Sequence, residues 1–156
     1  MDGLSVAASL TALVTVALHS SSFIYQFIEA VHDAPHRIKT LASRVDGLHQ
    51  TLVQIAQLID TQQLSEREES HPHLRELRRA LRACADDLQR LQSKLQKLNG
   101  AQDNCLRRAA YAVKSNLGSK EFEDAHAALK EHKQNLGLQL EILGRYKIQS
   151  QVGTRH

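Results

Sequence analysis

The chain has little of what builds β-sheets or disulfide frameworks. Its 156 residues include no tryptophan, three tyrosines, three phenylalanines, seven glycines, two prolines and two cysteines. Alternating runs of β-branched and aromatic residues are absent, so the sequence predicts no strands. Two cysteines, Cys84 and Cys105, are too few for a disulfide framework, which favours a reducing compartment. We therefore expect one all-α domain located in the cytoplasm.

The sequence also lacks the motifs of catalysis and metal binding. There is no glycine-rich phosphate loop and no Ser-His-Asp order, so we expect no catalytic residues and no enzyme. His71 and His73 with His126 or His132 have no ligand spacing, so we expect no metal and no cofactor. Cys84 and His132 fall on or near helical seams, where a buried apolar thiol and a hydrogen-bonded boundary histidine are the expected roles.

What the chain does have is apolar residues at heptad spacing in its middle. Two segments repeat the 3-4 spacing without a miss, and both patterns are typical of long helices packed along one seam. The seam residues are Ile38, Leu41, Val45, Leu48, Leu52, Ile55 and Ile59, and then Leu74, Leu77, Leu81, Cys84, Leu88, Leu91, Leu95 and Leu98.

Breaks in the pattern divide the chain into helices. A first helix is expected from about Leu4 to His32, because Pro35 disfavours helix for the residue before it. Further breaks follow at the polar stretch before Pro72 and at Asn99-Gly100. A shorter helix is expected within "CLRRAAYAVKSNLG", and a last one from Ser119 to about Ile148.

The sequence thus predicts an antiparallel four-helix bundle over residues 1–148, with an additional short helix, a hydrophobic N-terminal helix, and a flexible tail at 149–156. An extended coiled coil is the alternative. The spacing of the breaks favours helices that fold back on one another.

Positive charge is concentrated in the middle of the chain. The net charge is +3, but residues 1–69 hold four basic and eight acidic residues, whereas residues 75–114 hold ten basic and four acidic ones. A solvated helix face is the simplest explanation. The cations could also contact anionic lipid or a partner, and the candidates are Arg37, Lys39, Arg75, Arg78, Arg79 and Arg82. Few aromatic residues accompany them, which disfavours nucleic acid.

The opening segment is a long uncharged stretch. Gly3 to Ile28 are 26 consecutive residues without Asp, Glu, Lys or Arg, and no basic residue precedes Arg37, which disfavours a secretory signal. As a helix it would span ~39 Å at ~1.5 Å per residue, enough for a hydrocarbon core of ~30 Å. Ser and Thr on its other face suit either a bundle or lipid. The candidate membrane-inserting residues are Leu4, Val6, Leu10, Leu13, Val14, Leu18, Ile24 and Ile28.

Three stretches resemble the fungal HeLo-like domains, the N-terminal domains of fungal STAND receptors of the NACHT, NOD-like type. They are "MDGLSVAASLTALV", "FIYQFIEAVHDAPHRIKTLASRVDGLHQTL" and "LKEHKQNLGLQLEIL". The resemblance covers nearly the whole chain. Gly3 replaces a frequent proline, and Tyr111 stands where an aromatic residue, often tryptophan, is common.

The resemblance implies a cell-death execution or signalling domain of an innate-immunity receptor, similar to the HET-S HeLo domain, the mixed-lineage kinase-like pseudokinase bundle and plant coiled-coil resistance domains. In that class self-association releases an N-terminal helix that permeabilises the plasma membrane. It also implies a fragment whose NACHT, NB-ARC-type or amyloid-motif region lies C-terminal to these residues. A non-toxic protein-interaction module is the alternative, and nucleic-acid binding is a distant third.

Overall fold

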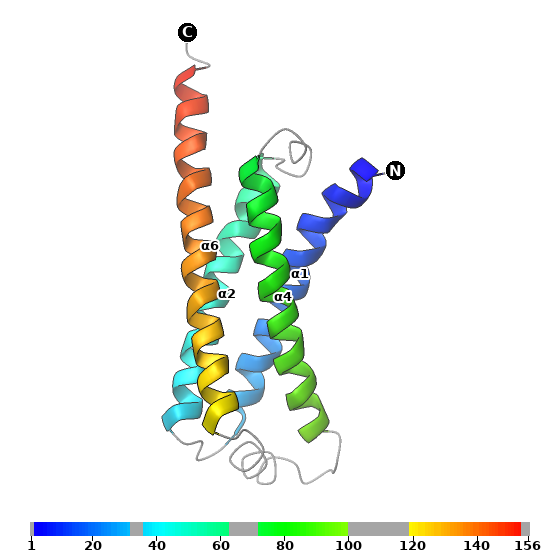
Figure 1. The fold of residues 1–156 in the computed structure, drawn as a ribbon, viewed down its shortest axis with the longest axis vertical. Helices are drawn as coiled ribbons and strands as arrows, with labels where there is room; N and C mark the ends of the chain where they lie inside the picture. Colours follow the sequence, from blue (N-terminus) through cyan, green and yellow to red (C-terminus); the bar gives the residue numbers. More distant parts are fainter. Residues whose placement is uncertain (1, 32–35, 63–71, 100–118, 154–156) are drawn as a thin grey trace.

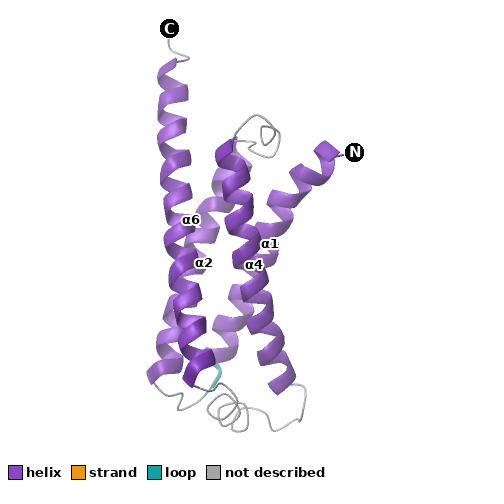
Figure 2. Cartoon of the chain, viewed as in Figure 1, coloured by secondary structure: helices purple, strands orange, loops and turns teal. Residues whose placement is uncertain are grey.

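The computed structural model describes residues 2–31, 36–62, 72–99 and 119–153 as long helices and the turn after the first (Figure 1). The helices are α1 (Asp2–Glu29), α2 (His36–Gln62), α4 (Pro72–Asn99) and α6 (Ser119–Gly153). No strand occurs in these ranges (Figure 2). The predicted all-α class is confirmed. The short helix expected within Cys105–Gly118 lies outside the described residues.

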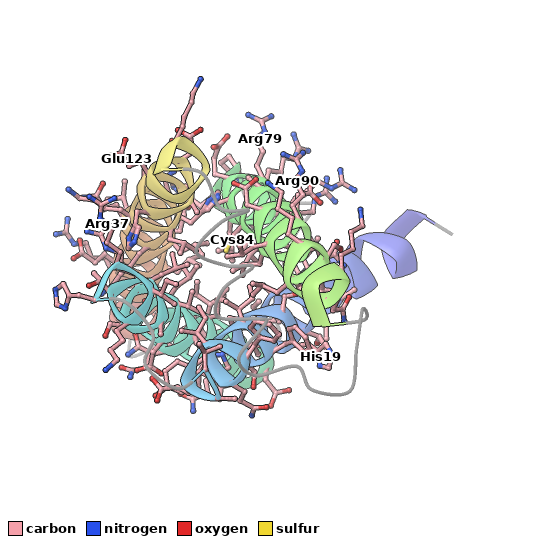
Figure 3. All side chains as sticks on the ribbon, turned by 90° about the horizontal axis from the view of Figure 1, so that it is seen from below. His19, Arg37, Arg79, Cys84, Arg90 and Glu123 are labelled. Atoms are coloured by element: carbon pink, nitrogen blue, oxygen red, sulfur yellow. The ribbon has the colours of Figure 1, made fainter. Side chains whose placement is uncertain are left out.

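The four helices form a bundle in which each one packs against two others. α1 contacts α2 and α4, and α6 contacts the same two helices on the other side. Seen along the bundle, α1 lies diagonally across from α6 (Figure 3). Successive helices alternate in direction (Figure 1). The packed pairs α1·α4 and α2·α6 are therefore parallel, whereas α1·α2 and α4·α6 are antiparallel.

Both heptad seams form the core, as the spacing predicts. Every seam residue of α2 is at most 5% exposed, and Leu74 to Leu95 on α4 are at most 8% exposed. Because each seam faces two neighbouring helices, it buries leucine and isoleucine side chains worth ~1.5 to 3 kcal/mol each. The core residues of α6 are Leu129, Leu136 and Leu143, with Ala125 and Leu140 packed against them.

Two polar residues on the seams have the roles that their positions indicate. Cys84 is fully buried, and burial, with the charge of Asp87 as a smaller cause, raises the pKa of its thiol to about 12. It is therefore a small apolar core residue and not a nucleophile. His132 is 8% exposed, and its Nε2 lies 2.6 Å from Oδ2 of Asp87, which links α6 to α4.

Two helix ends differ from expectation. α1 ends at Glu29 rather than near His32, and its exit is tightened by hydrogen bonds from Ala30 N to Gln26 O and from Val31 N to Ile28 O. α6 continues to Gly153, beyond the expected end near Ile148. No residue between Ile148 and Gly153 is a proline or glycine, so nothing in the sequence stops the helix earlier.

Candidate functional site

Helix α1 is long and apolar enough, over Leu10–Glu29, to cross a membrane. It is the one such helix in the part of the chain that the structure describes. A third of this span, 33%, is buried, which is much the same share as in α2 and α4, because in each helix one face packs against the core. Phe23 and Phe27, whose stacked rings lie 6.1 Å apart, are half-buried and pack against the edge of the core. α1 therefore has several apolar side chains that are only partly covered at the edge of the core.

The predicted membrane-inserting residues divide into three groups. Leu10, Val14, Ile24 and Ile28 are buried against α2 and α4, with exposures of at most 4%. Leu13 and Leu18 are partly buried at the edge of the core. The side chains of Leu4 and Val6 lie outside the described residues. On the opposite arc Thr11, Thr15, His19 and Gln26 are exposed.

Two neighbouring serines tie α1 to both of its partner helices. Ser20 donates a hydrogen bond from Oγ to Oε1 of Gln92 on α4, at 2.7 Å. Oγ of Ser21 lies 2.7 Å from Nδ1 of His49 on α2 and donates to the carbonyl of Leu18 at 3.0 Å. Both serines are at most 1% exposed. Sequence reasoning missed them, because Ser in a helix is usually read as exposed or self-bonded.

The six cations predicted to contact anionic lipid do not form one surface. Arg37 and Lys39 are exposed at the start of α2, next to the end of α1. The start of α4 lies at the other end of the bundle, and the cations exposed there are Arg75, Arg79 and Arg82 (Figure 1). Arg37 lies on the α2 side and Arg79 on the α4 side (Figure 3). Arg78 is half-buried, and Arg79 pairs with Glu76 at 3.4 Å. The sequence could not show this separation, since it depends on helix direction.

Two hydrogen bonds also connect α6 to the first part of α2. Nη1 of Arg44 donates to the carbonyl of His126 at 3.3 Å, and Nε2 of His126 donates to the carbonyl of Arg37 at 3.4 Å. Burial lowers the pKa of His126 below its ordinary value of 6.5. The bond to Arg37 opposes this effect, and the charge of Arg44 adds to it. His126 thus helps to position α6 as a neutral imidazole.

The described residues hold no group of three His, Cys, Asp or Glu side chains that could bind a metal ion. His73 is exposed at the start of α4, far along the bundle from His126, and His71 lies outside the described residues. The interactions that α1 itself can form are apolar packing and a few hydrogen bonds from neutral side chains. Such a surface can bind a bilayer or another protein.

The family described as pigment biosynthesis cluster protein PigL N-terminal matches residues 1–140. The chain belongs to this family. The match spans α1, α2 and α4 in full and α6 as far as Leu140, so it includes α1 and both serines with their partners. The family is related to the HeLo-like fungal domains, although the HeLo-like family itself gives no direct match. No curated protein and no solved structure matches the chain.

Proposed function

We propose that this domain executes or signals cell death in a fungal innate-immunity receptor. Its copies associate, α1 leaves the bundle, and α1 then targets or permeabilises the plasma membrane. The observation that carries the proposal is that α1 has the length and composition of a membrane span over Leu10–Glu29. Membership of a family related to the HeLo-like domains supports it.

The free energy of burying the apolar residues of α1 is similar in the protein core and in a lipid bilayer. Moving apolar side chains from a protein core to lipid changes their transfer free energy little, so smaller contacts decide where α1 resides. In the bundle those contacts are the hydrogen bonds of Ser20 and Ser21. In lipid, hydroxyls can bond to their own helix, as Thr15 does to the carbonyl of Thr11 at 2.7 Å and Ser21 to that of Leu18.

Departure of α1 would also strengthen the self-association that precedes it. α1 covers the inner faces of α2 and α4, so its release exposes buried residues of both seams to water. Exposed apolar surface of this extent favours contact with other copies. The protein is thus cytoplasmic at rest and moves to the plasma membrane on activation. Arg37 and Lys39, exposed just after α1, favour keeping the following helices on the cytosolic side.

A charge on the exposed arc of α1 separates membrane insertion from folding. Thr15 is exposed in the bundle, so Thr15→Glu should leave thermal unfolding nearly unchanged. A charge well inside the span costs ~2.5 to 3.5 kcal/mol on insertion scales, so dye leakage from phosphatidylcholine–phosphatidylserine vesicles should fall strongly. Gln26→Glu is the matched control: the same charge, on the same exposed arc, near the end of the span, should keep most of the leakage.

Two results would contradict the proposal. The first is a folded Thr15→Glu variant that leaks dye as fast as the parent. The second is a parent chain that never causes leakage, even when fused to a domain that forces it to oligomerise. The second result favours a protein-interaction module, for which the exposed cations Arg75, Arg79, Arg82 and Arg90 on α4 offer a surface for an acidic partner.

A further inference from the structure

A groove between α2 and α6 is lined by three positively charged residues. Its volume is about 300 Å³, and its lining residues are Thr40, Ser43 and Arg44 from α2 and Leu129, Lys130 and Lys133 from α6. Leu129 is buried, whereas the three cations are exposed. No described residue that lines the groove is acidic. The groove therefore presents three positive charges over an apolar floor.

The two lysines of the groove, Lys130 and Lys133, have no carboxylate partner among the described residues. Arg44 uses one donor for the carbonyl of His126, and a guanidinium has five N–H groups. Like charges held close together repel each other, so a ligand with several negative charges would relieve this repulsion.

The groove on the other side of α6 provides a comparison within the same molecule. It lies between α4 and α6, has a volume of about 250 Å³, and its charged lining residues are Asp87, Arg90, Lys94 and Asp124. Two carboxylates there balance two cations. Excess positive charge is therefore a property of the α2·α6 groove and not of the α6 surface in general.

Gly47 makes room for one of the cations. A Cβ atom at position 47 would lie 3.0 Å from Nζ of Lys133, so the ammonium group rests directly over the backbone of α2. Glycine inside a helix is less stable than alanine. Here its lack of a side chain allows Lys133 of α6 to lie against α2, in the groove that Ser43 and Arg44 also line.

The two hydroxyl groups of the groove differ in whether they can donate a hydrogen bond to a ligand. Thr40 donates its proton to the carbonyl of His36 at 2.9 Å. Ser43 is exposed and forms no hydrogen bond with another described residue, so its hydroxyl can donate to a ligand. The donors available in the groove are thus Ser43, Arg44, Lys130 and Lys133.

We propose that this groove binds a ligand that carries phosphate groups. A phosphate monoester has about −1.5 to −2 charges at neutral pH and three acceptor oxygens, which match cations that come from two helices. Guanidinium and ammonium groups form short, charge-assisted hydrogen bonds to such oxygens. A lone carboxylate has one charge and would leave most of the repulsion in place. This inference does not depend on insertion of α1 into a membrane.

Calorimetric titration with sodium tripolyphosphate tests the site directly. The double variant Lys130→Gln with Lys133→Gln should bind at least about tenfold more weakly for each cation removed, ~1.4 kcal/mol per tenfold. Lys120→Gln with Arg145→Gln removes the same charge from exposed positions of α6 outside the groove and should keep the parent affinity. Equal losses in both double variants, or no binding by the parent, would overturn the proposal.

Gly47→Ala tests the geometry while every charge is kept. The added methyl group should displace the Lys133 ammonium and weaken tripolyphosphate binding several-fold, with the helical circular dichroism spectrum unchanged. Unchanged affinity in both Gly47→Ala and the Lys130→Gln, Lys133→Gln variant would overturn the assignment of Lys133 to the ligand.

Vesicles distinguish a lipid headgroup from a free phosphate compound. Phosphatidylcholine vesicles with phosphatidic acid should bind the groove variant less than the Lys120→Gln, Arg145→Gln control if the ligand is a lipid. Equal vesicle binding, with tripolyphosphate binding lost only in the groove variant, assigns the groove to a soluble ligand. Both results support the groove as a phosphate site. Neither depends on dye leakage, so this proposal and that for α1 can fail separately.

Discussion

At the scale of single residues, His126 makes the stability of the bundle depend on pH. Its folded-state pKa is below 6.5, because burial and Arg44 disfavour the imidazolium more than the Arg37 carbonyl favours it. Between the two pKa values the unfolded chain binds more protons than the folded one. The stabilisation is therefore complete above pH 6.5 and is lost as the pH falls through the folded-state pKa.

An NMR titration of the imidazole Cε1 proton measures this effect. The chain has nine histidines, so His126→Gln identifies the signal by its loss. We expect a midpoint below 6.5, and a higher one in Arg44→Gln, because that change removes a neighbouring positive charge. Arg145→Gln, exposed further along α6, should leave it in place. A midpoint at or above 6.5 in the parent chain would show that burial does not control His126.

At the scale of the helix, the seam of α4 stabilises the bundle through tightly packed leucines. Leu88 is fully buried at the centre of the seam, so Leu88→Ala should lower the free energy of unfolding by ~2 to 5 kcal/mol in urea titration. Gln89→Ala changes the neighbouring exposed position and should alter it by less than ~0.5 kcal/mol. A loss below ~1 kcal/mol for Leu88→Ala would mean that this seam is not the core.

The sequence predicts the helices and their buried faces, but it does not predict which helices pack beside each other. Heptad spacing identifies the inner face of α2 and α4 because a helix rotates by a fixed angle per residue. Nothing in that periodicity says which seam packs beside which. The α1·α4 contact, and with it the Ser20–Gln92 hydrogen bond, depends on the bundle closing with α1 across from α6. For the same reason the sequence could not place Arg44 beside Lys130 and Lys133.

At the scale of the whole molecule, the docking of α1 depends on a few polar contacts. Ser20→Ala with Ser21→Ala removes the hydroxyls that reach Gln92 and His49, each hydrogen bond contributing ~0.5 to 1.5 kcal/mol. Amide hydrogen exchange should become faster throughout α1 and change less in α6, which packs mainly against α2 and α4. Ser22→Ala, a half-buried neighbour without such a bond, is the control.

Uniformly faster exchange in all four helices would contradict this expectation, because it would show that α1 opens only with the rest of the bundle. Faster exchange confined to α1 would instead show that the hydrogen bonds of the two serines stabilise the docking of this helix. The partners of the two serines, Gln92 and His49, could not be predicted from the fold class alone.

The pairing of α1 with α4 also has a consequence during synthesis on the ribosome. Ser20 and Gln92 are 72 residues apart, and at ~5 to 20 residues per second the chain needs roughly 4 to 15 s to make the second after the first. Until α4 is made, α2 is the only one of the described helices against which α1, the most apolar of them, can pack. A nascent chain in this condition is a substrate for chaperones that bind apolar segments, and its yield in cells will depend on how quickly α4 follows.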